Sequence, residues 1–182
     1  MQRPFLFLAF TAAFLSLVVS GCGGGAEPDP KAGEVAKWVL RRGGSVRARF
    51  TDAEGNDVNR KITDSANLPT GGFALEEIDL NQLPTNVPPI RDEELKVLEG
   101  LTNLQKLGLY GSNLSDKGTE TIAGLKSLRE LELSQTLITD AGLETLSTLP
   151  NLESLFLRNV GDKVTDEGVK AFERRTGAKV LH

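Results

Sequence analysis

The residue types that carry most enzyme chemistry are scarce in this chain. Its 182 residues include one cysteine, Cys22, and one histidine, His182. A nucleophile activated by histidine needs a Ser/His/Asp or Cys/His arrangement, and a zinc site needs several Cys and His ligands. One residue of each type, at opposite ends of the chain, builds neither arrangement. We therefore predict no enzyme, with no catalytic residue, no metal ligand and no cofactor.

Acidic residues are the remaining candidates for chemistry. Glu130 and Glu132 form a pair that in principle could act as acid and base, but we expect them on an open face with no pocket to exclude water. Asp116, Asp140 and Asp166 recur along the chain and raise the alternative of a calcium site. Each follows a Ser or Thr, and such a pair is well suited to cap a helix and to place a carboxylate at its positive end. We favour the capping role.

The first 21 residues have the composition of an export signal. Arg3 gives a minimal positive region, and the uncharged run 5–19 has fifteen residues, fewer than the roughly 20 needed to cross a bilayer. The run ends in Val19-Ser20-Gly21-Cys22, which resembles the lipobox of bacterial lipoproteins. The resemblance implies that Cys22 is lipidated and becomes the first residue of the mature chain. An ordinary cleaved signal peptide, or an uncleaved anchor, that happens to contain a cysteine is the alternative.

Lipidation of Cys22 would place an exported protein on a membrane without spanning it. The acyl chains that the resemblance implies bury enough CH₂ groups for stable anchoring at the cell envelope. Gly23 stands where Asp would resemble an inner-membrane retention signal, so we expect the outer membrane if two membranes exist. Residues 22–31 are rich in Gly and Pro and predict a flexible tether.

The charge balance argues against nucleic acid as a partner. The chain has 21 Lys and Arg against 25 Asp and Glu, a formal net charge of −4. Nucleic-acid binding demands clustered Lys and Arg, because phosphate neutralisation supplies most of its affinity. A protein partner is therefore the better expectation.

The C-terminal half repeats with a period of 24 residues. Matching units begin at Leu101, Leu125 and Leu149, and each continues as L-x-x-L-x-L. Leu75, Ile78 and Leu80 fit the same template further back. A period of 20–29 with this pattern is typical of coils that pair a short strand with a helical return. Stacked coils share one continuous leucine core, which no coil buries alone.

The segment 133–143, LSQTLITDAGL, resembles the repeat of bacterial leucine-rich-repeat proteins with ribonuclease-inhibitor-like coils, related to those of F-box substrate adaptors. The resemblance implies an α/β fold in which about four strand–helix coils form a short solenoid over residues 73–182. It also implies binding of another macromolecule. Residues 178–181 are expected to add a last short strand that closes the stack.

Residues 32–72 lack the repeat and are expected to cap the exposed end of the leucine core. Val35, Trp38 and Val39 have helical spacing and predict a helix over about 32–42, which Gly43 ends. The alternation in 46–50 predicts a strand. Residues 52–57 predict a turn, since the frame of a calcium loop is missing. These elements make a helix–strand cap.

The strand pattern also predicts a binding face. Leucines of L-x-x-L-x-L point inward, so the alternate residues form columns on the opposite, concave side. We expect Gly108 to leave a notch there beside Tyr110 and Phe156, and we prefer Tyr110, Phe156 and Arg158 as contacts because aromatic and Arg side chains dominate interface energies. The predicted binding residues are Glu77, Asp79, Lys106, Tyr110, Glu130, Glu132, Phe156 and Arg158.

The function that these features indicate is a protein-binding module at the bacterial cell envelope, with a partner of unknown identity. Three alternatives stay open. The face residues are merely solvated strand positions, the coil stack is a structural envelope component that associates with itself or with cell-wall polymer, or the domain has a sugar-binding or enzymatic accessory role.

Overall fold

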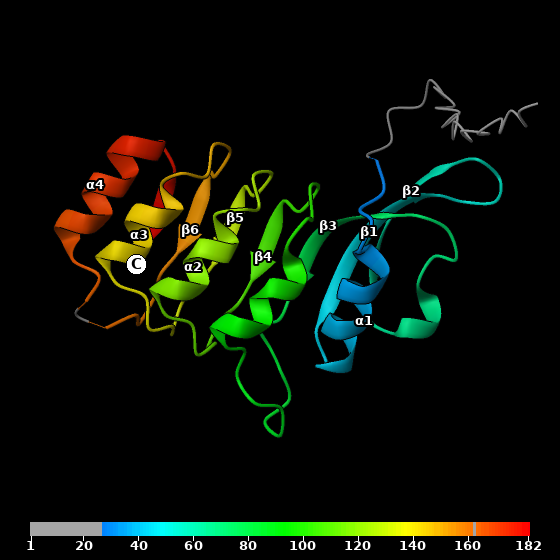
Figure 1. Ribbon diagram of the computed structural model, residues 1–182, viewed down its shortest axis with the longest axis horizontal. Coiled ribbons are helices and arrows are strands. Elements are labelled where there is room, and N and C mark those ends of the chain that lie inside the picture. Colours follow the sequence, from blue (N-terminus) through cyan, green and yellow to red (C-terminus); the bar gives the residue numbers. More distant parts are fainter. Residues whose placement is uncertain (1–26, 162) are drawn as a thin grey trace, which may run out of the picture.

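The computed structural model describes residues 27–161 and 163–182. Their strands form one seven-stranded sheet in the order β2-β1-β3-β4-β5-β6-β7, and α1 to α4 all lie on one side of it (Figure 1). The pairing is antiparallel among β2, β1 and β3 and parallel from β3 to β7. Parallel neighbours joined through helices are the arrangement that repeated strand–helix coils produce. Among the described residues, no helix is long and apolar enough to cross a membrane.

The N-terminal part of the sheet is built by α1 (Ala32–Arg41), β1 (Ser45–Thr51), β2 (Asp57–Ile62) and the 3₁₀ helix η1 (Ser65–Asn67). The buried stripe of α1 is Ala32, Val35, Ala36 and Val39, and it packs over β1. Gly43 adopts a φ of 84° directly after the helix, a conformation that glycine adopts without steric cost. The predicted helix and the strand over 46–50 are confirmed.

A tight turn joins β1 to β2, as the sequence predicted. The Asp52 carboxylate accepts hydrogen bonds from the backbone N–H groups of Asn56 (2.8 Å) and Glu54 (3.1 Å). The bonds from Asn56 and Glu54 lower the pKa of Asp52, because they stabilise the ionised carboxylate. The strand β2 that follows the turn was not expected from the sequence.

The coils begin with β3 (Ala74–Asp79). In chain order they contain η2 (Asp92–Leu98), β4 (Lys106–Gly108), α2 (Asp116–Ile122), β5 (Glu130–Glu132), α3 (Asp140–Leu146), β6 (Ser154–Phe156), α4 (Asp166–Thr176) and β7 (Lys179–Leu181). The first coil returns through a longer loop and a 3₁₀ helix, whereas the next three return through α-helices. The closing strand that the sequence placed at 178–181 is present as β7.

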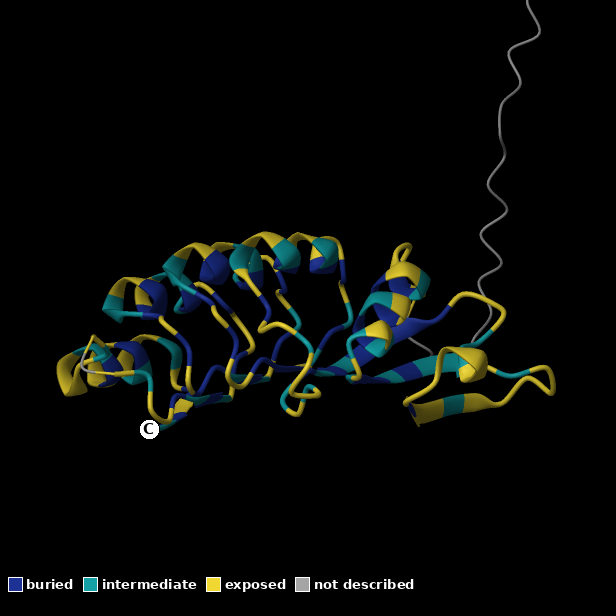
Figure 2. Ribbon diagram, turned by 90° about the horizontal axis from the view of Figure 1, so that it is seen from below, coloured by how far each residue is buried: buried dark blue, intermediate teal, exposed yellow. Residues whose placement is uncertain are grey.

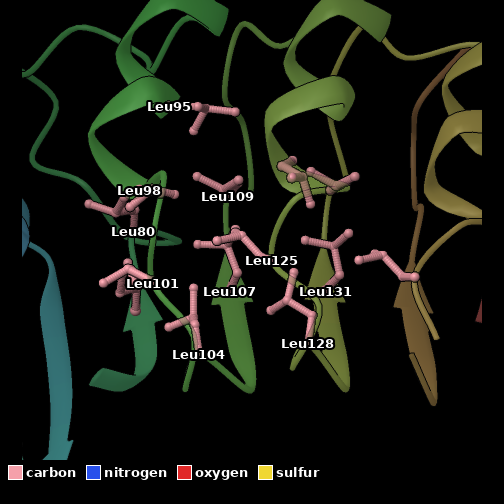
Figure 3. Packing of buried hydrophobic residues seen from close by; sticks show 14 of the residues in the cluster. Leu80, Leu95, Leu98, Leu101, Leu104, Leu107, Leu109, Leu125, Leu128 and Leu131 are labelled. Carbon is pink, nitrogen blue, oxygen red and sulfur yellow. The ribbon is translucent and has the colours of Figure 1, made fainter. Parts of the chain in front are cut away.

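The repeated leucines fill the space between sheet and helices. Figure 3 shows them in register from coil to coil, and Figure 2 shows the buried side of each helix turned toward the strands. Leu107, Leu131 and Leu155, which pair in register on β4, β5 and β6, are buried. Burying a leucine side chain contributes about 1.5–3 kcal/mol, so this column of apolar contacts is the main source of stability.

Neighbouring coils are also joined by a ladder of carboxylates. Asp92 accepts from the backbone N–H (2.9 Å) and the hydroxyl (2.6 Å) of Ser115 in the next coil. Asp116 binds Thr139 in the same two ways, at 2.8 and 2.7 Å. Asp140 repeats the arrangement with Thr165, at 2.9 and 2.8 Å. We call these three joints the Asp ladder.

The hydroxyls of the Asp ladder have a second role, which the sequence predicted. Ser115, Thr139 and Thr165 are the N-caps of α2, α3 and α4, and their side-chain oxygens accept from backbone N–H groups of the first turn. Each hydroxyl therefore donates to the preceding coil while it caps its own helix. Capping was foreseen, but the bond between coils was not.

Candidate binding face

The sheet face turned away from the helices brings the predicted residues together. The pairing register places Glu77, Lys106, Glu130 and Ser154 side by side in one column, and Asp79, Gly108, Glu132 and Phe156 in the next. The residues between them, such as Ile78, Leu107 and Leu131, are buried on the core side. The period-2 geometry of strands thus produces these two columns as predicted. We call this surface the concave face.

The centre of the concave face is hollowed. The hollow has a volume of about 250 Å³. We call it the concave hollow. Six of the eight predicted binding residues line it: Glu77, Asp79, Lys106, Glu130, Glu132 and Phe156.

Tyr110 and Arg158 lie beside the concave hollow and not in its lining. Each follows a residue of the second column by two positions, just beyond the ends of β4 and β6, and with Ser134 they form a third column. Tyr110 is 42% exposed, one of two large exposed apolar side chains among the described residues. Ser134 stands between them in the same column, is buried, and accepts from the backbone N–H of Arg158 at 2.9 Å. The two exposed side chains therefore flank a buried serine.

The predicted notch beside Gly108 is confirmed in part, because Gly108 and Phe156 line the concave hollow and Tyr110 does not. A Cβ atom at Gly108 would lie only 2.7 Å from the Cγ of Asn81, so the Asn81 amide already occupies that space. The same amide oxygen accepts from the backbone N–H of Tyr110 at 3.0 Å. Residue 108 is a glycine because the side chain of Asn81 lies over it. The hydrogen bond from Tyr110 to Asn81 also fixes the backbone where the loop after β4 begins.

Most charges of the concave face are neutralised within it. Arg47 binds Glu77 at 2.9 Å, Lys61 binds Asp79 at 3.8 Å, and Lys106 binds Glu130 at 2.7 Å. The cations of the first two pairs come from β1 and β2. Sequence reasoning missed Arg47 and Lys61 as members of this face, since they belong to strands outside the repeat. The alternation of apolar and polar residues along β1 could have placed Arg47 on this face.

Glu132 differs from the other carboxylates of the concave hollow. One of its oxygens accepts from the backbone N–H of Ser134 at 2.6 Å. Within residues 27–161 and 163–182, no Lys or Arg nitrogen lies within 4.0 Å of it. Phe156 is its register partner on β6. The hollow thus contains one negative charge without a cation, next to an aromatic ring.

Cys22, the predicted lipidation residue, lies outside the described residues. The nearest described part of the chain is fixed to the body, because Asp29 is buried with 4% exposure. Its carboxylate accepts from the backbone N–H of Leu75 (2.9 Å) and of Thr102 (2.8 Å). The end of the predicted tether therefore docks on the first coil.

Comparison with known proteins agrees with this architecture. Residues 102–159 match the family model described as Leucine rich repeat. No curated protein matches the chain. The matched segment covers β4 to β6, and the helices and parallel strands around it confirm the expected α/β class, a short solenoid with an antiparallel N-terminal cap. Repeats of this family are typically protein-binding and generally non-catalytic.

Proposed function

Because the chain contains a leucine-rich-repeat domain, we propose that it is a non-catalytic protein-binding module, held at a bacterial cell envelope through Cys22. Its partner is a protein that seats on the concave face. Solenoids of stacked repeats use such extended surfaces for recognition. The anchor determines where the face is presented, and the face determines what is captured.

The observation that carries the proposal is the concave hollow with its flanking side chains. Phe156 and the uncompensated Glu132 line it, while Tyr110 and Arg158 stand at its edge. Tyr and Arg are enriched among residues that dominate interface energies, because each buries a large area at low entropic cost. If these residues were merely solvated strand positions, nothing would favour two aromatic rings, an arginine and an unpaired carboxylate around one hollow.

The test removes the aromatic contacts without touching the core. Tyr110→Ala combined with Phe156→Ala is expected to weaken partner capture at least tenfold in a quantitative pull-down from the native envelope. The midpoint of thermal unfolding should stay within a few degrees of the parent. Leu137→Ala, at a side chain that is 61% exposed in the loop after β5, is the matched control and should leave capture intact. Undiminished capture by the double variant would exclude the concave face.

The anchor has a separate test. Cys22→Ser removes the only sulfur that an acyl chain can occupy. We expect the variant to leave the membrane fraction and to lose detergent-phase partition, because no other lipidation residue replaces it. A membrane fraction equal to that of the parent would refute the lipid anchor. Concentration-dependent self-association of the purified domain would instead favour the structural envelope role.

A further inference from the structure

The cap and the repeats carry opposite charge. Residues 31–63 contain eight Lys and Arg and four Asp and Glu, a formal charge of +4. Residues 64–182 contain twelve basic and nineteen acidic residues, a formal charge of −7. The small net charge of the whole chain therefore conceals a strong dipole along the solenoid. Any charged surface will distinguish its two ends.

Half of the cap cations are already paired. Arg42 binds Glu94, Arg47 binds Glu77, Arg49 binds Glu76 and Lys61 binds Asp79. The other four are exposed, and in the part of the chain that the structure describes no carboxylate oxygen lies within 4.0 Å of their charged nitrogens. We name this set the basic cap surface: Lys31, Lys37, Arg41 and Arg60.

The basic cap surface lies on the helix side of the sheet. Lys37 and Arg41 lie on the exposed face of α1, opposite its buried stripe, and Lys31 is the N-cap of the same helix. Arg60 pairs in register with Ala48, a residue buried on the side that α1 covers, so its side chain projects to that side too. Its guanidinium lies 5.6 Å from the ring centre of Phe50. The concave face is on the opposite side of the same sheet.

The position of Asp29 limits the distance between the cap and any anchor at Cys22. Asp29 is held by Leu75 and Thr102, and only seven residue steps separate it from Cys22. A fully extended chain of that length spans at most about 25 Å. Lys31 follows Asp29 by two positions. An anchored cap thus stays within a few Debye lengths, each about 8–10 Å, of the headgroups.

We propose that the basic cap surface docks on a bilayer rich in anionic headgroups and turns the concave face away from that bilayer. The inference rests on the proposed anchor at Cys22. Four cations give weak attraction by themselves, and the anchor supplies the local concentration that makes it effective. The acidic repeats are repelled by the same surface, which favours the cap end as the point of contact.

The experiment uses two residues whose types each occur once in the chain. Cys22, the only cysteine, permits coupling of the chain from residue 22 onward to a maleimide lipid in vesicles, which imitates acylation. Trp38, the only tryptophan, lies in α1 and serves as the energy donor to dansyl-labelled headgroups. We expect at least twofold more energy transfer on phosphatidylglycerol-containing vesicles than on phosphatidylcholine vesicles, with a difference that disappears in high salt.

Charge reversal identifies the surface. Lys37→Glu combined with Arg41→Glu should abolish the lipid-dependent difference in transfer. Lys126→Glu combined with Lys170→Glu makes the same charge change on the repeats and should preserve the difference. The energy transfer of each variant is calculated relative to its own tryptophan emission on vesicles without dansyl. This removes any direct effect of the substitutions on the emission of Trp38.

Three results would overturn the proposal. They are equal transfer on both vesicle types, equal loss in both pairs of variants, and binding of soluble inorganic polyphosphate as strong as binding of the vesicles. Because maleimide coupling bypasses acylation in the cell, these results are distinct from a failure of the Cys22→Ser test. They would leave the anchor and the concave face standing.

Discussion

The Asp ladder shows how a single residue type serves two coils. Asp116 was expected to support only its own helix, since its position after Ser115 is that of a capping pair. The bond to Thr139 was not predictable from the local sequence, because it depends on how coils stack. The core leucines, in contrast, were predictable from their period alone. Local patterns identify what a residue can bind, and stacking decides its partner.

Removal of one ladder carboxylate should destabilise the fold measurably. Asp116→Ala leaves the backbone N–H and the hydroxyl of Thr139 without their acceptor. Loss of a bond to a charged group costs about 1.5–3 kcal/mol, so we expect the free energy of unfolding to fall by that amount. Urea denaturation measures it. Glu120→Ala, at an exposed position of the same helix, should change it by less than about 0.5 kcal/mol.

At the scale of elements, the repeats were more predictable than the cap. The hairpin partner β2 was missed because Val58 and Ile62 are its only apolar residues, so it has no strand signal of its own. It forms because β1 offers a free edge and Asp52 fixes the turn. Because β2 was missed, Lys61, the cation that pairs with Asp79, was not assigned to the concave face. The columns on β3 to β6 were predictable, since period and alternation define them.

Glycines in the coil helices permit the Asp ladder, and one substitution tests this. A Cβ atom at Gly142 would lie 2.5 Å from Oδ1 of Asp116, and one at Gly118 would lie 2.6 Å from Oδ1 of Asp92. Alanine usually stabilises a helix by up to about 1 kcal/mol relative to glycine. We expect Gly142→Ala to lower the free energy of unfolding instead, because the methyl group displaces the carboxylate.

The matched control for Gly142→Ala lies in another helix. At Gly33 in α1, an added Cβ meets nothing within 4 Å. Gly33→Ala should therefore raise the free energy of unfolding by a few tenths to about 1 kcal/mol. Thermal unfolding of the two variants should shift in opposite directions. A stabilised Gly142→Ala protein would contradict the proposed steric role.

At the scale of the whole molecule, Asp29 joins the start of the described chain to the first coil. Its bonds to Leu75 and Thr102 span 46 and 73 residues. Asp29→Ala should lower the free energy of unfolding by about 2–3 kcal/mol, because two backbone N–H groups lose a buried charged acceptor. Hydrogen exchange at Leu75 and Thr102 should accelerate. Glu27→Ala, an exposed neighbour, is the control, and equal exchange in both variants would refute the clamp.

The regularity of the Asp ladder has a consequence for how the molecule tolerates change in length. Every joint from Asp92 to Thr165 uses the same donors and acceptors, so one coil can follow another without an adapter. Insertion of a second copy of a whole unit would lengthen the stack and leave both ends intact. The acceptor and donor residues are 23 positions apart in the first two joints and 25 apart in the third, so the third unit holds two extra residues without breaking the bonds. In genetic terms, the molecule accepts insertions of whole coils, and it accepts short insertions in the segment before α4.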